Sequence, residues 1–446
     1  MMKILLRIIV ATFLLPLVSC SEKEYLNVIP RESVAVISVD AQRLSTLGNS
    51  GIDNALKSLL GVDNTEGCGV DFSSKIYLFE TPDGALGLVA RVESADEMTE
   101  WLSELSVSGK CTVPEEHLGN MFVTIGNSWF AGYSDEALVL VGPVSAMQRA
   151  ETRQRLQKMF RQTEEQGVRE TQIFKRLELL DAPIAFVSRL SALPEKMSLP
   201  FALFTPKEAD ASQIILSATV DKEGELMVIR GETMSFNEKI NSKLQENNKV
   251  LRPITKEFFG KLSPDCIGSM FMNVEGERLL KLMQQSKEMQ PLLVGVNTSI
   301  DMDNILRAIN GDMVLYFSSL EGDFDFIANL KNKDFLADVG YWKTSCPAGS
   351  SITNAGKDAY LYTNGGMVYS FAVDTDNHFI SSLRHNKAST AVTASAPKPL
   401  PKEIAGKIEG STLAMLIDLG NIDDETVGNI VKSLFGGASK ILYIKE

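Results

Sequence analysis

The sequence predicts an α+β protein made of two tandem, related modules, each a mixed or antiparallel sheet with helices packed on one side. Two observations support this fold class. Apolar runs joined by short turns alternate with helical stretches along the chain, which is typical of helices packed on antiparallel hairpins. The same series of blocks also occurs twice, in the same order. We therefore expect an internal duplication, with module one over residues 27–250 and module two over 251–446.

Each module opens with a proline-led apolar strand that runs into a helix. This block begins at Pro30 in module one and at Pro264 in module two. A hairpin and a second helix follow in both modules, because two apolar runs flank a turn that contains glycine. The hairpin strands are 76–79 with 86–92 in module one, and 314–317 with 324–330 in module two.

An aromatic hairpin and two later strands complete the repeat. The corresponding segments are 121–130 and 359–371, then 183–187 and 412–416, then 211–216 and 438–443. The chain ends soon after Ile441, whereas module one continues into a further strand and helix. We therefore expect module two to be shortened at its C-terminus. Its last strand, 440–444, would then have an open edge, completed by a partner or a second copy.

The first residues are typical of a bacterial lipoprotein signal. Lys3 and Arg7 precede a short apolar core, and Leu17-Val18-Ser19-Cys20 resembles the lipobox. The core is shorter than the roughly 20 apolar residues of a membrane-spanning helix. We expect residues 1–19 to be removed, Cys20 to be lipidated, and residues 20–26 to form a tether; an ordinary secretion signal with a chance cysteine is the alternative. Several acyl chains on Cys20 would hold the protein stably at a membrane.

The charge balance argues against nucleic acid as a partner. The formal net charge is −13, and removing Lys3 and Arg7 with the signal makes the rest more acidic. One helical stretch, 149–180, is rich in arginine, but glutamates interleave with the arginines throughout. This pattern indicates a solvated helix face. Apolar residues at 44% and charged residues at 23% are ordinary for a globular protein.

Four cysteines follow Cys20, and none forms a CxxC pair, so the sequence supports neither a zinc site nor a thioredoxin-type site. In an oxidising compartment, Cys68 and Cys111 are the pair most compatible with a disulfide, because both lie in module one. Buried thiols acting as small apolar side chains are an equal alternative.

No catalytic or cofactor-binding residue is predicted. The histidines are His117, His378 and His385, and none lies in a nucleophile motif. The segment around Ser128 is better explained as a hairpin turn than as a nucleophile elbow. Segment 349–358 departs from a phosphate loop in its first glycine and in its final hydroxyl residue.

Asp374, Asp376 and His378 occupy alternate positions, which in a strand would direct three metal ligands to one face. The intervening Thr375 and Asn377 favour a polar turn instead. We prefer the turn and predict no metal site. For the aromatic side chains of the two hairpins, we prefer core packing over a ligand-binding surface. These residues are Trp129, Phe130, Tyr360, Tyr362 and Tyr369.

Three features together resemble a known family. They are Cys20 with its short polar spacer, the stretch Tyr25–Pro30 that leads into a valine-rich strand, and Gly69-Val70-Asp71-Phe72 just before strand 76–79. They resemble a family of Bacteroides-type lipoproteins whose domain has no known function. The resemblance implies a Gram-negative envelope, with lipid anchoring at the outer membrane, facing the periplasm or the surface. It implies no activity, cofactor or catalytic residue.

The leading functional hypothesis is a membrane-tethered, non-enzymatic binding or envelope-maintenance protein. Its expected partners are the membrane, through lipid on Cys20, and other envelope proteins or glycan. One alternative is a hydrolase of envelope or glycan substrates that uses paired carboxylates. The other is a chaperone-like partner of envelope proteins, which would expose a large apolar groove. The sequence does not indicate an oligomeric state.

Overall fold

The computed structural model describes residues 23–46, 57, 64–126, 128–193, 195–261, 266–286, 300–318, 323–385, 399–421 and 438–445. Cys20 and residues 1–19, the expected signal segment, lie outside these residues. Contacts divide the chain near Ala192 into two compact units, apart from a few residues after Leu216 that group with unit 1. The predicted modules 27–250 and 251–446 are defined by the sequence repeat and not by contacts. Their boundaries stay a prediction.

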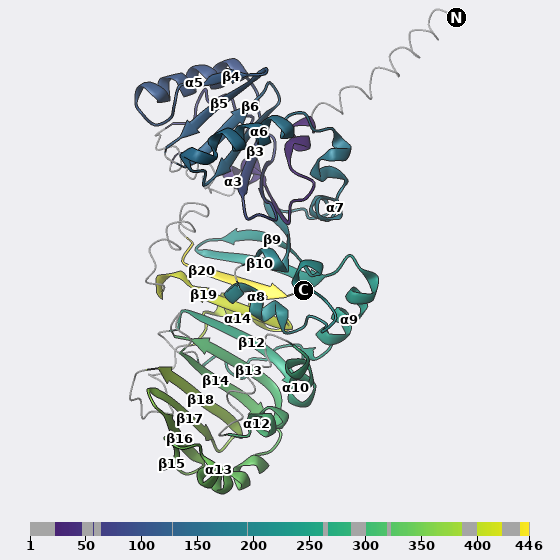
Figure 1. Ribbon diagram of the computed structural model, residues 1–446. Helices are drawn as coiled ribbons and strands as arrows, with labels where there is room; N and C mark the ends of the chain where they lie inside the picture. Colours follow the sequence, from purple (N-terminus) through teal and green to yellow (C-terminus); the bar gives the residue numbers. More distant parts are fainter. Residues whose placement is uncertain are drawn as a thin grey trace, which may run out of the picture. The chain divides into compact units, whose positions relative to one another are not determined.

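Unit 1 is an antiparallel sheet with the strand order β8–β1–β2–β3–β7–β6–β5–β4. Figure 1 labels β3, β4, β5 and β6 of this sheet. The strands are β1 (Ala35–Val39), β2 (Ile76–Glu80), β3 (Leu86–Arg91), β4 (Glu115–His117), β5 (Asn120–Ile125), β6 (Trp129–Tyr133), β7 (Ala137–Gly142) and β8 (Ile184–Arg189). The helices are α3 (Ala41–Thr46), α5 (Ala95–Val107), α6 (Arg149–Met159) and α7 (Gln172–Glu178), with a 3₁₀ helix η1 at Glu24–Val28.

Helix α5 covers part of one face of this sheet. It begins after Ser94, whose hydroxyl accepts a hydrogen bond from the Glu97 N–H at 3.2 Å, a standard N-cap. Met98 and Leu102, one turn apart, are buried against apolar residues of β5, β6 and β7. The helix is therefore held by one apolar stripe that faces the sheet.

Unit 2 has a longer sheet, with the order β9–β10–β20–β19–β12–β13–β14–β18–β17–β16–β15. Strand β10 runs parallel to β20, and the pairings from β20 to β15 are antiparallel. The strands are β9 (Ile215–Glu223), β10 (Leu226–Met234), β11 (Leu251–Arg252), β12 (Gly268–Glu275), β13 (Ile309–Phe317), β14 (Phe324–Leu330), β15 (Ser350–Gly356), β16 (Ala359–Asn364), β17 (Met367–Val373), β18 (His378–His385), β19 (Leu413–Asp418) and β20 (Lys440–Lys445). The helices are α8 (Glu195–Ala202), α9 (Glu238–Asn248), α10 (Gly276–Gln285), α12 (Met302–Ala308), α13 (Val339–Ser345) and α14 (Lys402–Ile408).

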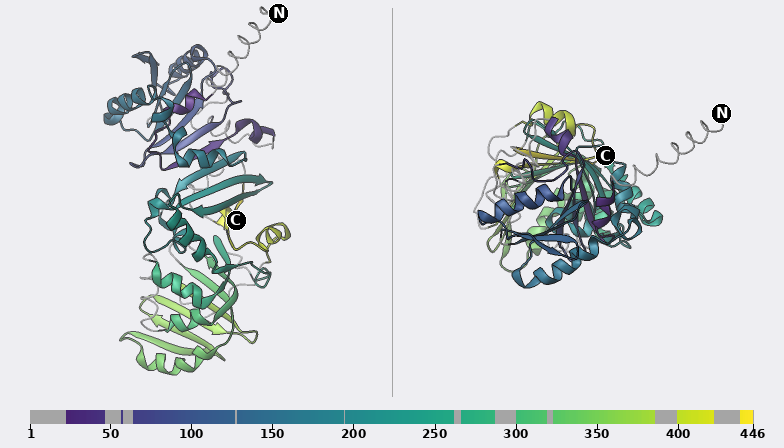
Figure 2. Two further views of the ribbon diagram at one scale, coloured as in Figure 1. Left: turned by 90° about the vertical axis from the view of Figure 1, so that its right-hand side faces the viewer. Right: turned by 90° about the horizontal axis from the view of Figure 1, so that it is seen from above.

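Within unit 2, α9, α10 and α12 gather along one side of the strands (Figures 1 and 2). Helix α14 contributes Ile404 and Ile408 to a core that also contains Phe258, Phe271 and Leu442. Strands and helices are thus segregated into layers, and the predicted α+β class is confirmed. Within the described residues, no helix is long and apolar enough to cross a membrane.

The same order of eight strands occurs in both units. Strands β8–β1–β2–β3–β7–β6–β5–β4 of unit 1 correspond in order to β19–β12–β13–β14–β18–β17–β16–β15 of unit 2. For β1, β2, β3, β5, β6 and β8, this correspondence pairs the same segments as the repeated sequence blocks do. The duplication itself stays a prediction, because two sheets can share a topology without sharing an origin.

The expectation of an open edge on the last strand is wrong. Strand β20 pairs with β19 on one side and with β10 on the other, so the same chain completes its edge. Leu442 in its middle is fully buried. The physical reason is that hairpin β9–β10, which the sequence assigned to module one, belongs to the sheet of unit 2. The free edge of β10 pairs with β20. Neither a second copy nor a partner is needed to pair this strand.

Candidate functional sites

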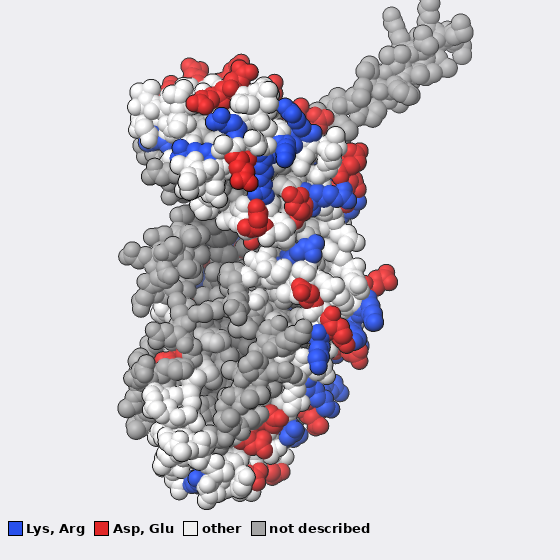
Figure 3. All heavy atoms as spheres, viewed as in Figure 1, with Lys and Arg blue, Asp and Glu red and all other residues white. Residues whose placement is uncertain are grey.

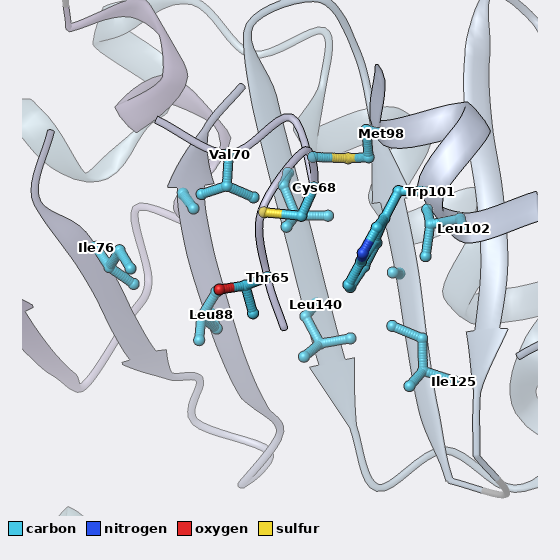
Figure 4. A pocket seen from close by; sticks show the side chains of 13 residues that line it. Thr65, Cys68, Val70, Ile76, Leu88, Met98, Trp101, Leu102, Ile125 and Leu140 are labelled. Carbon is cyan, nitrogen blue, oxygen red and sulfur yellow. The ribbon is translucent and has the colours of Figure 1, made fainter. Parts of the chain in front are cut away.

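Unit 1 contains an apolar cavity between its sheet and helix α5 (Figure 4). Its volume is about 50 Å³, within about 620 Å³ of empty space that includes open solvent at its mouth. Strands β2, β3, β5, β6 and β7 form the floor, α5 forms one wall, and the loop before β2 forms another. The lining residues are Thr65, Cys68, Val70, Ile76, Leu88, Ala90, Met98, Trp101, Leu102, Ile125, Ala131, Leu138 and Leu140.

Gly69 sets the path of the loop that carries Cys68 and Val70. Its φ is +72°, and a Cβ there would lie 2.3 Å from the Ser94 carbonyl oxygen and 2.8 Å from the Met98 nitrogen. Only glycine fits this left-handed conformation and this close approach to α5. The Gly69 carbonyl also accepts hydrogen bonds from the N–H groups of Glu93 and Ser94. Gly69 thus positions Cys68 and Val70 in the lining of the cavity.

The cavity offers almost no polar contact. Apart from the Thr65 hydroxyl, the Cys68 thiol and the Trp101 indole N–H, its lining side chains are hydrocarbon or thioether. A peptide or sugar placed here would leave polar groups without hydrogen bonds, at about 1–3 kcal/mol each. The lining favours an apolar occupant and contains no carboxylate that could act as an acid or base.

In unit 2, the turn between β17 and β18 brings together three residues that the sequence singled out. Asp374, Asp376 and His378 each present a ligand atom, and these atoms lie within 4.8 Å of one another. The Asp374 carboxylate accepts hydrogen bonds from the backbone N–H of Asp376 at 2.9 Å and of His378 at 2.8 Å. Asn377 adopts a positive φ of 61°, which lets the chain reverse. The structure therefore contains the polar turn that we preferred and also clusters the three side chains.

Two residues that the sequence did not suggest complete this histidine cluster. Glu257 Oε1 lies 3.3 Å from His378 Nε2, and Lys261 Nζ lies 3.2 Å from His378 Nδ1. The imidazole is buried, with 7% of its side chain exposed, and packs edge-on against Phe258. Glu257 and Lys261 lie more than 100 residues before His378, and no local pattern connects them.

The carboxylate of Asp374 is held in its ionised form. Burial alone would raise its pKa, but the hydrogen bonds from the backbone and ring of His378 outweigh burial and lower the pKa. Its distance to His378 Nδ1 is 2.9 Å. The cluster thus combines an anionic turn, a buried imidazole and one ammonium group.

The described cysteines are all thiols in this structure, so Cys68 and Cys111 do not form the suggested disulfide here. Cys68 is buried at the cavity wall. The Cys111 thiol donates a hydrogen bond to the Leu102 carbonyl at 3.2 Å, and burial raises its pKa. The pairing stays a prediction for the oxidised protein.

The other two histidines and the hairpin aromatics lie outside both of these sites or outside the described side chains. His117 lies in the exposed strand β4, with Nδ1 2.6 Å from Gln157 Nε2. The side chain of His385 lies outside the described part of the structure. Tyr360 and Tyr369 stack on Phe371, with ring centroids 5.3 and 5.9 Å apart, and Phe130 stacks on Phe122.

Two of the arginines in helix α6 form ion pairs with acidic residues of unit 1. Arg153 pairs with Glu115 at 3.5 Å, and Arg155 pairs with Asp83 at 3.1 Å. On the face shown in Figure 3, acidic and basic side chains of the described residues are interspersed. This arrangement fits the interpretation of a solvated helix face.

A family model covers residues 48–396, which is most of the chain. The chain belongs to the family of the domain of unknown function DUF4836. The resemblance found in the sequence is confirmed to this extent, while the Bacteroides-type lipoprotein assignment stays a prediction. The comparison with curated proteins finds no match.

Solved structures with some similarity include three crystal forms of TP0453. Form I has 11% identity and a TM-score of 0.30, covering 51% of this chain and 84% of that one. Form III has 9% identity and a TM-score of 0.22, covering 82% and 96%. Form IV has 12% identity and a TM-score of 0.25, covering 38% of this chain and 65% of that chain, which is just under two thirds of its length. At TM-scores this low we draw nothing from the likeness.

Proposed function

We propose that this DUF4836 protein is a non-enzymatic binding protein, held at the outer membrane by lipid on Cys20, whose unit 1 cavity takes the end of a hydrocarbon chain. The observation that carries the proposal is the apolar lining of the cavity beneath α5. Each methylene that leaves water for such a site contributes about 0.8 kcal/mol. A few methylenes would therefore give measurable binding without any polar contact.

The lining also separates this proposal from the alternatives. A hydrolase would need carboxylates that face each other across a cleft, and the cavity wall has none. Glycan recognition needs hydrogen-bonding side chains, of which Thr65, Cys68 and Trp101 are the available few. An acyl chain, either free or from a neighbouring lipid, needs no hydrogen bond and therefore matches the apolar lining.

The experiment measures binding of a fluorescent fatty acid, dansyl-undecanoic acid, to the full chain, with dodecanoic acid as the competitor. Leu88→Arg places a charge in the cavity wall and should weaken binding at least about tenfold, because a buried guanidinium needs water or a counter-ion. Leu86→Arg is the matched control: Leu86 lies on the same strand, outside the lining, with 46% exposure.

Met98→Leu provides a second check that conserves volume and should keep binding within about threefold. Circular dichroism establishes that each variant folds. Equal probe affinity for wild type and folded Leu88→Arg would refute the proposal, and so would the absence of probe binding by the wild type.

A further inference from the structure

We propose that Asp374, Asp376 and His378 form a binding site for a divalent transition-metal ion, for which Zn²⁺ is the best fit. The site lies at the β17–β18 turn of unit 2 and is independent of the apolar cavity of unit 1. It therefore stands or falls separately from the proposed function.

The donor atoms are already gathered. One imidazole nitrogen and two carboxylates offer ligand atoms that lie within 4.8 Å of one another. Asp376 is exposed and Asp374 is half-buried, so an ion can approach from solvent on their side. The turn conformation, with its left-handed Asn377, places these donors without rearrangement of either strand.

The orientation of the imidazole is set from outside the turn. Glu257 Oε1 lies 3.3 Å from His378 Nε2, so the tautomer with a proton on Nε2 donates to this carboxylate. Nδ1, which lies 2.9 Å from Asp374 Oδ2, is then the ligand nitrogen, and a metal ion would replace the proton through which it contacts that carboxylate. A carboxylate on the second ring nitrogen is the usual partner of a metal-binding histidine, because it fixes the tautomer and increases the basicity of the ligand nitrogen. Glu257 is therefore the positioning residue of this site.

A cation already lies at this position. The Lys261 ammonium is 3.2 Å from Nδ1, the ring nitrogen that also lies 2.9 Å from Asp374 Oδ2. Lys261 is exposed and also lies over the Phe258 ring at 5.7 Å. A long exposed side chain can move into solvent at little cost. Because the ammonium lies at the nitrogen that a metal ion would use, it would compete with the ion for Nδ1.

The mixed donor set decides which metal fits. Imidazole nitrogen with carboxylate oxygen suits Zn²⁺ and its neighbours among the transition metals. Mg²⁺ and Ca²⁺ prefer sites made entirely of oxygen and should bind much more weakly. With three protein ligands, a fourth position is left for water or a small anion.

The test titrates the metal-stripped full chain with Zn²⁺ by calorimetry and repeats the titration with Mg²⁺. Asp376→Asn should weaken the site at least about tenfold, since it removes a charged ligand from an exposed position that the fold does not need. Lys261→Met keeps the apolar stem and removes the competing charge. It should tighten Zn²⁺ binding at least about fivefold, because it removes the repulsion between the Lys261 ammonium and a metal ion at roughly 4 Å.

Asp135→Asn is the matched control, because Asp135 is an exposed aspartate in the β6–β7 turn of unit 1, without a histidine beside it. It should leave Zn²⁺ affinity unchanged. Zinc binding that Asp376→Asn does not weaken would overturn the proposal. So would a Lys261→Met variant that binds no more tightly than wild type, or equal affinity for Mg²⁺ and Zn²⁺.

Discussion

The β6–β7 turn of unit 1 and the β17–β18 turn of unit 2 occupy the same place in the strand order, but they differ in chemistry. In unit 1, the Ser134 hydroxyl accepts hydrogen bonds from the N–H groups of Glu136 and Ala137 at 3.3 and 3.2 Å. In unit 2, the Asp374 carboxylate accepts from Asp376 and His378 at 2.9 and 2.8 Å. Both turns are capped by an oxygen on the side chain of their first residue.

The residue that opens the next strand shows the difference. It is Ala137 in unit 1 and His378 in unit 2, and both are buried. An alanine suffices to begin this strand, so the fold does not require an imidazole there. The comparison teaches that the capping oxygen belongs to the fold, whereas the histidine and its partners Glu257 and Lys261 are additions particular to unit 2.

A second contrast concerns the sheet beyond the eight shared strands. Unit 2 continues from β19 into β20 and then into β10. Leu442 of β20 is fully buried in the same core as Val228 of β10 and Ala414 of β19. This extension should account for a large part of the stability of unit 2.

The largest expected effect is that of Leu442→Ala. Removing a fully buried leucine side chain should lower the unfolding free energy of unit 2 by about 2–5 kcal/mol, from lost transfer energy and a residual cavity. Urea-dependent hydrogen exchange followed by mass spectrometry separates peptides of the two units. Leu442→Met, the volume-conserving control, should cost less than about 1.5 kcal/mol. A loss below about 1 kcal/mol for alanine would mean that β20 is not packed between β10 and β19.

The strands that could be predicted from the sequence are those whose signals are local. Runs 76–79 and 324–330 correspond to β2 (Ile76–Glu80) and β14 (Phe324–Leu330), because apolar residues bounded by turns determine them. The partner of β20 could not be predicted in this way. Strand β10 lies more than 200 residues earlier, and nothing local specifies which free edge a strand will join.

The residues of the histidine cluster differ in the same way, because some have a local sequence signal and others do not. Residues 374–378 could be recognised as a polar turn, because Asp, Thr and Asn favour turns by local hydrogen bonding. Glu257 and Lys261 could not, since tertiary folding alone brings them to His378. The unit 1 cavity was missed for the same reason: its lining comes from five strands, a helix and a loop.

The next effect concerns Lys445, at the end of β20. Its ammonium is buried, 2.8 Å from Asn248 Oδ1 and 4.8 Å from the Phe204 ring centroid. Burial lowers its pKa to about 8. Between about pH 8 and pH 10.5, the unfolded chain therefore binds more protons at this residue than the native state does, so stability rises with pH.

This rise should be on the order of 3 kcal/mol across that window, and it should disappear in Lys445→Met. The measurement is the difference in unfolding free energy of unit 2 between wild type and variant, taken at pH 7 and again near pH 10. Peptides of unit 1 supply the internal control, because their exchange should show the same pH dependence in both proteins. A wild-type-minus-variant difference that stays constant with pH would contradict the lowered pKa.

The smallest effect tests the two turns directly, with chelator present so that no metal contributes. Asp374→Ala removes a charged acceptor from two N–H groups and from the ring of a buried histidine, and it should cost unit 2 about 1.5–3 kcal/mol. Ser134→Ala removes a neutral acceptor from a turn that water can reach, and it should cost unit 1 about 0.5–1 kcal/mol. The exposed neighbours supply matched controls, since Thr375→Ala and Asp135→Ala should each stay within about 0.5 kcal/mol of wild type. Equal losses in the two units would mean that His378 adds nothing to its turn beyond what Ala137 provides, and the contrast between the two turns would then be one of sequence alone.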